Sequence, residues 1–272
     1  MLDFYKNCSS QLSDFEIWEG YYKRRFNEFK IFYSLFPEKK FSNTLEIGCG
    51  IGYQAGFLSC ISDKVIASDV DYGNMIQHSR GLSITKQFIK KSGIENIEVV
   101  NANAENLPFK DEQFDFIYSS YSFQYIKNKD KALQEIKRVL KKDGYFFCVL
   151  PTSINRIKAT LYYYQTILQK SSQFFKSSFN KKNIAGKETE IIIQRKWYTK
   201  LLPPPDDNSN NFLSEFLLYS SFRWQKLFLR NQHQVCVKKY TSFSNSNNRL
   251  YDFFRNFKSK FISDGIILVS KK

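Results

Sequence analysis

The chain has 272 residues, of which 42% are hydrophobic and 17% aromatic, so it can bury a substantial core as one large domain or two small ones. It contains no apolar run long enough to cross a bilayer, and its first residues are too polar and acidic for a secretory signal. Five widely spaced cysteines and only two histidines argue against a disulfide scaffold and against a zinc site. We therefore expect no bound metal and a cytoplasmic location.

The positive charge is concentrated in the second part of the chain. Residues 1–150 carry 20 Lys and Arg against 19 Asp and Glu, a net charge of +1, whereas residues 151–272 carry 21 against 7, a net charge of +14. This asymmetry is typical of a region that binds an anionic partner such as nucleic acid, a lipid headgroup or a phosphorylated substrate. A Lys-rich composition on solvated surfaces explains it equally well, and both interpretations stay open.

The first part of the chain alternates between predicted helices and predicted strands. Aromatic residues at helical spacing predict a helix over 15–36, closed by Pro37. The predicted strands that follow cover 44–47, 65–68, 97–100, 114–119 and 145–150, and the predicted helices cover 53–61, 74–91 and 130–142. We expect Asp130 to cap the last of these helices and Gly144 to end it. Short apolar strands that alternate with helices indicate a parallel sheet covered on both faces.

After Pro151 the alternation stops. The pattern predicts one long helix over 155–179, a short strand at 191–193 and a second helix over 212–230. Two final strands are predicted at 234–243 and 261–269. The last strands are therefore expected to complete the sheet, with a mainly helical insertion before them.

A glycine-rich segment follows the first strand, where Gly48, Gly50 and Gly52 alternate with other residues. Glycines at this place let the backbone turn tightly and approach a ligand. A triphosphate loop needs a Lys that is absent here, and a dinucleotide loop needs a third glycine where Tyr53 stands. Glu46 would also repel a pyrophosphate, whereas it would favour a cationic ligand such as S-adenosylmethionine (SAM).

The second strand ends at Asp69, 19 residues after Gly50. A carboxylate at that distance can accept hydrogen bonds from both ribose hydroxyls of a nucleotide. Capping of the next helix is the alternative role for Asp69.

Together, these motifs resemble the class I SAM-dependent methyltransferases, specifically their small-molecule branch with a methyltransferase-11-like domain. The resemblance spans about residues 40–150 and includes the glycine loop, Ser68–Asp71, Asn101–Phe109, Phe114–Ser120 and Leu140–Gly144. It implies an α/β, doubly wound, Rossmann-like sheet of seven mostly parallel strands with an antiparallel last strand, and a helical insertion between strands 5 and 6.

The resemblance also implies which residues contact SAM: Glu46, Gly48, Cys49, Gly50, Asp69, Val70, Asn103, Ala104, Ser119, Ser120 and Tyr121. The first four would surround the methionine part, and Asp69 and Val70 would hold the ribose and one face of the adenine. Asn103 departs from the family, which usually has Asp at this position. Its carbonyl can still accept a hydrogen bond from the adenine, but without the assistance of a charge.

No residue is identified as the catalytic base. The candidates are His233, Tyr121 and Tyr125, while Gln124 can orient an acceptor hydroxyl but cannot remove its proton. The Asn/Asp-Pro-Pro-aromatic motif of amino methyltransferases is absent after the fourth strand. By exclusion, we expect an oxygen acceptor.

The resemblance suggests four parts of the chain: an N-terminal helical cap (1–39), the SAM-binding core (40–151), a helical lid or substrate insertion (152–232) and the final strands (233–272). In the insertion, Arg195, Lys196, Lys200 and Arg223 lie among Trp197, Tyr198 and Trp224, a mixture suited to a sugar or base that carries phosphate. Tyr162–Tyr164 with Lys158 and Lys170 could also rest on a membrane surface.

The sequence therefore predicts a SAM-dependent methyltransferase for a small, anionic oxygen acceptor such as a glycan, a glycolipid or an acid. The first alternative is an RNA methyltransferase that uses the basic region 151–272. The second is a catalytically weak, SAM-binding partner subunit.

Overall fold

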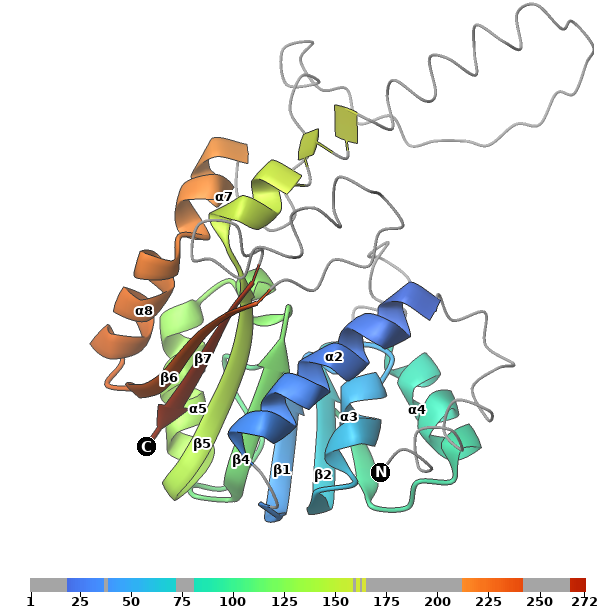
Figure 1. Ribbon diagram of the computed structural model, residues 1–272. Helices are drawn as coiled ribbons and strands as arrows, with labels where there is room; N and C mark the ends of the chain where they lie inside the picture. Colours follow the sequence, from blue (N-terminus) through green and yellow to red (C-terminus); the bar gives the residue numbers. More distant parts are fainter. Residues whose placement is uncertain are drawn as a thin grey trace, which may run out of the picture.

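The structure is a computed structural model that describes residues 19–36, 39–71, 81–158, 160–161, 163–164, 212–241 and 265–272. Its centre is a seven-stranded sheet with the order β3-β2-β1-β4-β5-β7-β6 (Figure 1). The strands are β1 (Phe41–Ile47), β2 (Ser62–Asp69), β3 (Ile97–Asn101), β4 (Phe114–Ser120), β5 (Leu140–Pro151), β6 (Gln234–Thr241) and β7 (Gly265–Lys271). Strand β7 is antiparallel to both of its neighbours, β5 and β6, and the pairs from β3 to β5 are parallel. The predicted fold class is confirmed.

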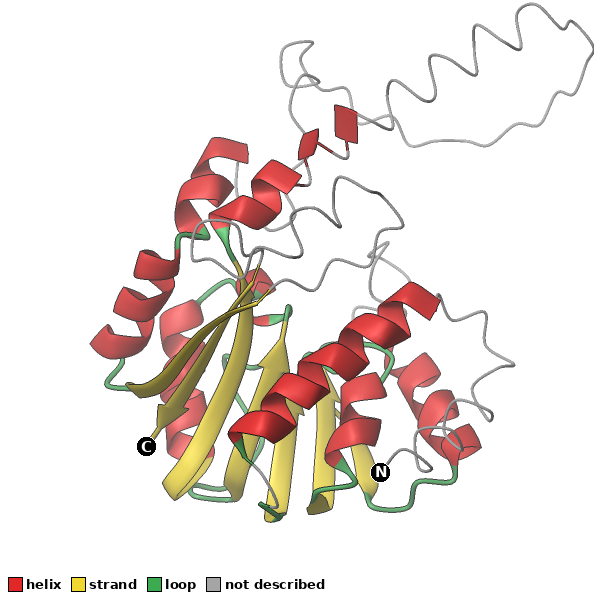
Figure 2. Cartoon of the chain, viewed as in Figure 1, coloured by secondary structure: helices red, strands yellow, loops and turns green. Residues whose placement is uncertain are grey.

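Helices cover both faces of this sheet (Figure 2). They are α2 (Glu19–Leu35), α3 (Tyr53–Leu58), α4 (Gly81–Ser92), α5 (Lys129–Val139), α7 (Phe212–Leu218) and α8 (Ser221–Arg230), with a short 3₁₀ turn, η2, at Phe123–Tyr125. A further helical segment begins at Ser153. None of the helices in the described part of the chain is both long enough and apolar enough to span a membrane.

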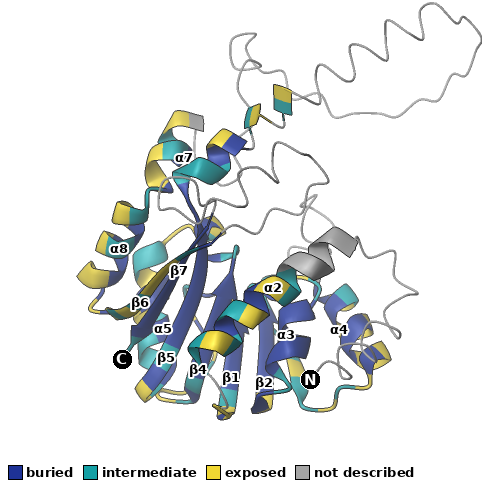
Figure 3. Ribbon diagram, in the orientation of Figure 1, coloured by how far each residue is buried: buried dark blue, intermediate teal, exposed yellow. Residues whose placement is uncertain are grey.

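The two faces of the sheet bury separate apolar clusters, because successive strand residues point to opposite sides. On one side Phe146 and Cys148 of β5 pack with residues of α5 and α8. On the other side Phe147 and Val149 pack with residues of α2 and α3. Figure 3 shows the resulting buried centre of the sheet. The continuous apolar run of β5 is thus explained by burial on both faces.

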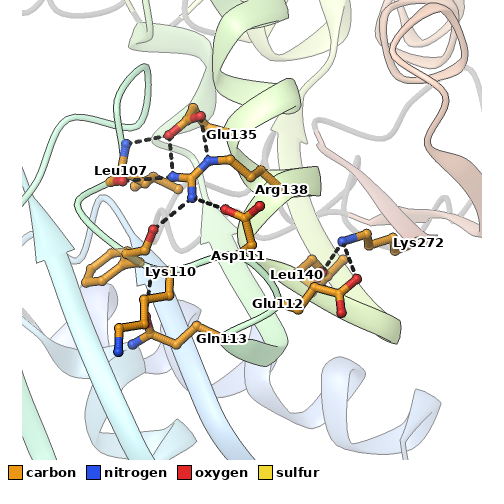
Figure 4. A network of polar contacts seen from close by, with 10 residues as sticks. Leu107, Lys110, Asp111, Glu112, Gln113, Glu135, Arg138, Leu140 and Lys272 are labelled. Atoms are coloured by element: carbon orange, nitrogen blue, oxygen red, sulfur yellow. Dashed lines mark hydrogen bonds and ion pairs between the residues drawn. The ribbon is translucent and has the colours of Figure 1, made fainter.

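Arg138, in the last turn of α5, holds the segment between β3 and β4 in place (Figure 4). Its guanidinium donates to the carbonyl oxygens of Leu107 (3.0 Å) and Phe109 (2.8 Å) and to the carboxylate of Asp111 (2.7 Å). Lys272 likewise ties the end of β7 to the Leu140 carbonyl at 2.7 Å. Through the Arg138 contacts, the loop that carries Asn103 and Ala104 is anchored to α5.

The structure corrects the prediction for α5. Asn128, not Asp130, caps the helix, since its side chain accepts a hydrogen bond from the Lys131 amide. Asp130 instead pairs with Arg230 of α8. The helix ends at Val139 because Leu140 has an extended backbone and pairs with Phe114, so the residues up to Gly144 belong to β5.

The helix predicted over 212–230 is two helices. The helical conformation is interrupted at Tyr219 and Ser220, between α7 and α8. Ser220 has an extended backbone, and its side chain accepts a hydrogen bond from the Arg223 amide. This N-cap starts a new helix, an arrangement that helical periodicity alone does not reveal. The predicted helical residues 74–80 and 165–179 and the predicted strand 191–193 lie outside the described residues.

Candidate functional site at the exit of strand β1

The glycine loop turns sharply where β1 ends. Gly48, Gly50 and Gly52 have φ angles of 75°, 54° and 95°, in the left-handed region that favours glycine. The amides of Gly48 and Cys49 both donate to the Ser68 carbonyl oxygen, at 2.8 and 3.0 Å. The loop is therefore fixed to the end of β2 by its own backbone.

Two of these glycines differ in what surrounds them. A Cβ atom on Gly48 would lie 2.2 Å from the Cβ of Ser122, whereas a Cβ on Gly50 would meet no atom of the described residues within 4 Å. Ser122 follows β4, and its hydroxyl donates to the Ile47 carbonyl oxygen at 2.8 Å. Gly48 thus allows the β4 end to pack against the loop, and the backbone at Gly50 faces open space.

Glu46 places a buried carboxylate directly before the loop. Its side chain is 3% exposed, and among the described residues Oε2 has no hydrogen-bond partner. Burial raises the pKa of Glu46 to about 8, with Arg25 opposing the shift and Asp69 and Glu28 adding to it. A buried acceptor without a partner costs free energy, which a cationic ligand would recover.

Asp69, at the end of β2, holds the glycine loop. Its Oδ2 accepts a hydrogen bond from the Gly50 amide at 2.9 Å, and its Oδ1 accepts one from the Val70 amide at 2.8 Å. Burial raises the pKa of Asp69, and these two hydrogen bonds act in the opposite direction. Each carboxylate oxygen keeps a second lone pair with which it can accept a ligand hydroxyl.

A buried polar network ties α2 to the end of β4, and the sequence analysis missed it. Oε2 of Glu28 accepts from Arg25 (2.9 Å), Gln54 (2.8 Å) and Ser120 (2.7 Å), and Arg25 also donates to Ser120 Oγ at 2.7 Å. Gln54 extends the network to the hydroxyl of Tyr118 at 2.9 Å. The N-terminal helix therefore fixes Ser120, one of the predicted cofactor residues.

The helix pattern contained a signal for this network. The aromatic residues at helical spacing in α2 include Phe26, Phe29 and Tyr33, but among the described side chains of this helix the fully buried ones are Glu28, Phe29 and Phe32. Arg25 and Glu28 are three residues apart, on the same face as Phe32, so they were available as an ion pair inside the interface. A charged pair on the core side of an amphipathic helix indicates a buried polar contact.

The end of β4 and the segment after it carry four more predicted residues. Ser119 is buried, and its hydroxyl hydrogen-bonds to that of Ser122 at 2.7 Å. Tyr121 has a φ of 49°, which turns the chain out of the strand. Gln124 is 3% exposed; its Nε2 donates to the Tyr121 carbonyl oxygen at 2.9 Å, and its Oε1 has no hydrogen-bond partner among the described residues. Tyr125 is half exposed.

The remaining cofactor candidates lie around the ends of β1 and β3. Cys49 is buried, which raises the pKa of its thiol. Ala104 is buried, while Asn103 is exposed and its side-chain oxygen accepts from the Glu105 amide at 2.9 Å. Asn103 thus shapes the turn after β3, and its second carbonyl lone pair is the one available to a ligand.

His233 lies in the core, away from the glycine loop. It precedes β6, and its ring contacts Ser270 Oγ (3.1 Å) and the Leu133 carbonyl oxygen (3.0 Å). The carbonyl requires Nε2 to be the donor, so in the neutral ring Nδ1 accepts from Ser270. Burial lowers the pKa of His233, which favours this neutral form. Both ring nitrogens are therefore occupied by the protein.

The described aromatic and basic residues of the insertion differ in their burial. Trp224 is buried, donates to the Pro151 carbonyl oxygen at 2.9 Å and stacks on Tyr219, so it belongs to the core. Arg223 is exposed. Lys158 is buried, which contradicts its predicted place on a membrane surface. Tyr163 and Tyr164 are described. The remaining residues predicted to bind a phosphorylated sugar or base, or to rest on a membrane surface, lie outside the described residues: Tyr162, Lys170, Arg195, Lys196, Trp197, Tyr198 and Lys200.

Comparisons with known proteins agree with this geometry. A family model described as a methyltransferase domain matches residues 45–148. The uncharacterized methyltransferase YcgJ of Bacillus subtilis is 32% identical over 105 residues, which cover 39% of this chain and 39% of YcgJ. The YcgJ crystal structure superimposes with a TM-score of 0.54 at 17% identity, covering 91% of this chain and 99% of that one.

Two further relatives have named activities. The sterol 4-C-methyltransferase strm-1 of Caenorhabditis elegans is 34% identical over 110 residues, 38% of this chain and 29% of that protein. The ubiquinone/menaquinone biosynthesis C-methyltransferase UbiE of Brucella canis is 48% identical over 64 residues, 24% of each chain. All three matches cover less than two-fifths of the relative's length. Residues 45–148 are therefore similar to the methyltransferase domain of class I SAM-dependent methyltransferases.

Proposed function

We propose that the protein binds SAM at the exit of β1 and transfers its methyl group to an oxygen atom of a small acceptor. The observation that carries this proposal is the buried Oε2 atom of Glu46, which has no hydrogen-bond partner in the described part of the chain. A carboxylate in that position suits a ligand with positive charge and disfavours a phosphate. The open space at Gly50 supports the approach of such a ligand to the backbone.

In this proposal the chain's residues bind and orient the cofactor. Glu46, Gly48, Cys49 and Gly50 hold its methionine part, Asp69 holds the ribose hydroxyls, and Val70, Asn103 and Ala104 contact the adenine. When bound, SAM supplies a methyl group on a positively charged sulfur. Ser119, Ser120 and Tyr121 line the side from which the acceptor approaches, while residues 1–39 cap the core and residues 152–232 cover the acceptor.

Gln124 is the residue that we propose orients the acceptor. Its Nε2 is held by the Tyr121 carbonyl oxygen, which leaves the buried Oε1 to accept a hydrogen bond from an acceptor hydroxyl. Gln124 cannot remove a proton. An acceptor that is already anionic, such as a carboxylate, needs no general base and is therefore the acceptor that suits these residues best. Alignment and exclusion of water are then their main contributions.

A carbon acceptor is the second candidate, since strm-1 and UbiE are both named C-methyltransferases. An assay with labelled SAM and a panel of hydroxyl, carboxyl and activated-carbon acceptors separates the two. Label in ester or ether products supports the oxygen acceptor. Label found only on carbon would overturn it, and a folded protein that gives no heat with SAM in calorimetry would overturn the proposed function itself.

Asp69→Ala is expected to weaken SAM binding by about 1–3 kcal/mol, because charged hydrogen bonds to the ribose are lost. Isothermal titration calorimetry measures the change in affinity. Asp71→Ala is the matched control: its carboxylate lies two residues further along the chain, and we expect the affinity of that variant to remain near that of the wild type. Equal losses in both variants would contradict the role of Asp69.

SAM affinity is also expected to depend on the protonation of Glu46. In the free protein this carboxyl has a pKa of about 8, so it is mostly protonated at lower pH. A cationic ligand favours the carboxylate and lowers that pKa, so binding releases a proton and affinity rises with pH by up to about tenfold per unit below pH 8.

Titrations in two buffers of different ionisation enthalpy count the protons released on binding. Glu46→Gln cannot titrate, and it should reduce both the proton release and the slope of affinity against pH. The ligand's own titration is common to both proteins and cancels in the comparison. An unchanged slope in Glu46→Gln would exclude Glu46 from the binding site.

A further inference from the structure

Exposed apolar side chains are concentrated on the helices that follow β5. Nine large apolar side chains of the described residues are exposed, and all but Tyr125 lie between Ile157 and Leu229. Helices α2 to α5 contribute none of them. The concentration therefore belongs to one region of the molecule and does not follow from overall composition.

These side chains form stripes at helical spacing. Leu213 and Leu217 lie four residues apart on α7, and Phe222 and Leu229 lie seven apart on α8. Phe222 is 72% exposed and Leu213 is 64% exposed. Figure 3 shows exposed residues on the side of α7 and α8 that faces away from the sheet. We call these four residues with Leu218 the outer α7–α8 surface.

The helical segment that begins at Ser153 adjoins this surface. Ser153 donates to the Phe216 carbonyl oxygen at 2.6 Å, and Arg156 pairs with Glu215 at 2.7 Å. The same segment exposes Ile157, Leu161 and Tyr164, again spaced for one face of a helix. Apolar exposure therefore continues from α7 onto its neighbour.

The charges on the outer α7–α8 surface are positive. Lys226 lies between Phe222 and Leu229 on the same stripe, and Arg223 is adjacent; both are exposed. Glu215 is the one acidic residue between Phe212 and Arg230, and it is buried against Arg156. An apolar stripe flanked by cations and without exposed acids is the pattern of a helix that lies in a membrane interface.

We propose that the outer α7–α8 surface docks on an anionic lipid bilayer, with Phe222 and the leucines inserted among the lipids and Arg223 and Lys226 at the headgroups. A second copy of the chain fits less well, because a two-fold contact would place this cationic surface against itself, with no exposed acidic residue of α7 or α8 to pair with the cations. Nucleic acid also fits less well, because leucines neither stack on bases nor bind phosphates. This proposal does not depend on the proposed methyl transfer.

Flotation of the full chain with lipid vesicles tests the proposal. We expect binding to phosphatidylcholine vesicles that contain phosphatidylserine, weaker binding to pure phosphatidylcholine, and a decrease with added salt. Phe222→Ser should lower the partition coefficient by about tenfold through lost apolar burial. Tyr125→Ser is the matched control, because it removes the exposed aromatic residue outside this region, and it should bind as the wild type does.

The double variant Arg223→Gln/Lys226→Gln should reduce the preference for phosphatidylserine and the salt dependence. Unfolding midpoints equal to that of the wild type would show that the variants remain folded. If Phe222→Ser binds vesicles as well as the wild type, other basic segments hold the lipid and the proposal is wrong. It is also wrong if no vesicle binds while Phe222→Ser converts a dimer to a monomer in analytical ultracentrifugation.

Discussion

Glu215→Gln should lower the free energy of unfolding by about 3–5 kcal/mol, because it removes the carboxylate that pairs with the buried Arg156 guanidinium. The two side chains are 0% and 1% exposed and meet at 2.7 Å. Water cannot reach the remaining charge to replace the lost partner. Urea denaturation measures the loss, and Arg156→Met should produce a loss of similar size.

The double variant Arg156→Met/Glu215→Gln is the control for this prediction. With both charges removed, neither member of the pair is left buried without the other, so the double variant should be substantially more stable than the sum of the single losses predicts. Additive losses would show that the two residues act independently. The pair joins the segment after β5 to α7, so it contributes to holding α7 in place.

Gly48→Ala should destabilise the protein by about 3 kcal/mol and abolish measurable SAM binding. Two costs combine: a left-handed backbone at φ 75° for a residue with a side chain, and a Cβ only 2.2 Å from that of Ser122. Relief of the clash would move the segment after β4, which carries Tyr121 and Gln124. Thermal unfolding and calorimetry with SAM measure the two effects.

Gly50→Ala separates the backbone cost from the packing cost. Its φ is 54° and its Cβ would meet no atom within 4 Å, so the stability loss should be only about 1 kcal/mol. Ser122→Gly should recover part of the stability when combined with Gly48→Ala, since it removes the clashing atom. Equal stability losses for the two alanine variants would contradict the packing argument.

Much of the central sheet could be predicted because its strands carry strong local signals. Continuous apolar runs, the glycine loop and the carboxylate of Asp69 are all readable within a few residues, and the resemblance supplied the antiparallel last strand. The element ends were less predictable. The end of α5 depends on the pairing of Leu140 with Phe114, a contact between residues far apart in sequence.

The part of the site contributed by α2 could be predicted only in part. Helical spacing places Arg25 and Glu28 on the same face as Phe32, but only the packing of α2 on the sheet reveals their contacts with Gln54 and Ser120. That the buried Glu46 Oε2 and Gln124 Oε1 have no hydrogen-bond partner among the described residues is likewise a property of three-dimensional packing. Residue type predicts which chemistry is available, whereas burial determines how strongly it is used.

The position of β7 inside the sheet has a consequence for synthesis on the ribosome. Gly265–Lys271 pairs with β5 on one side and β6 on the other, and its residues are buried up to Ser270. Until these residues leave the exit tunnel, the nascent chain holds β5 as an open apolar edge that neighbouring chains could pair with. Closure of the sheet therefore requires a strand that the ribosome makes well after β5.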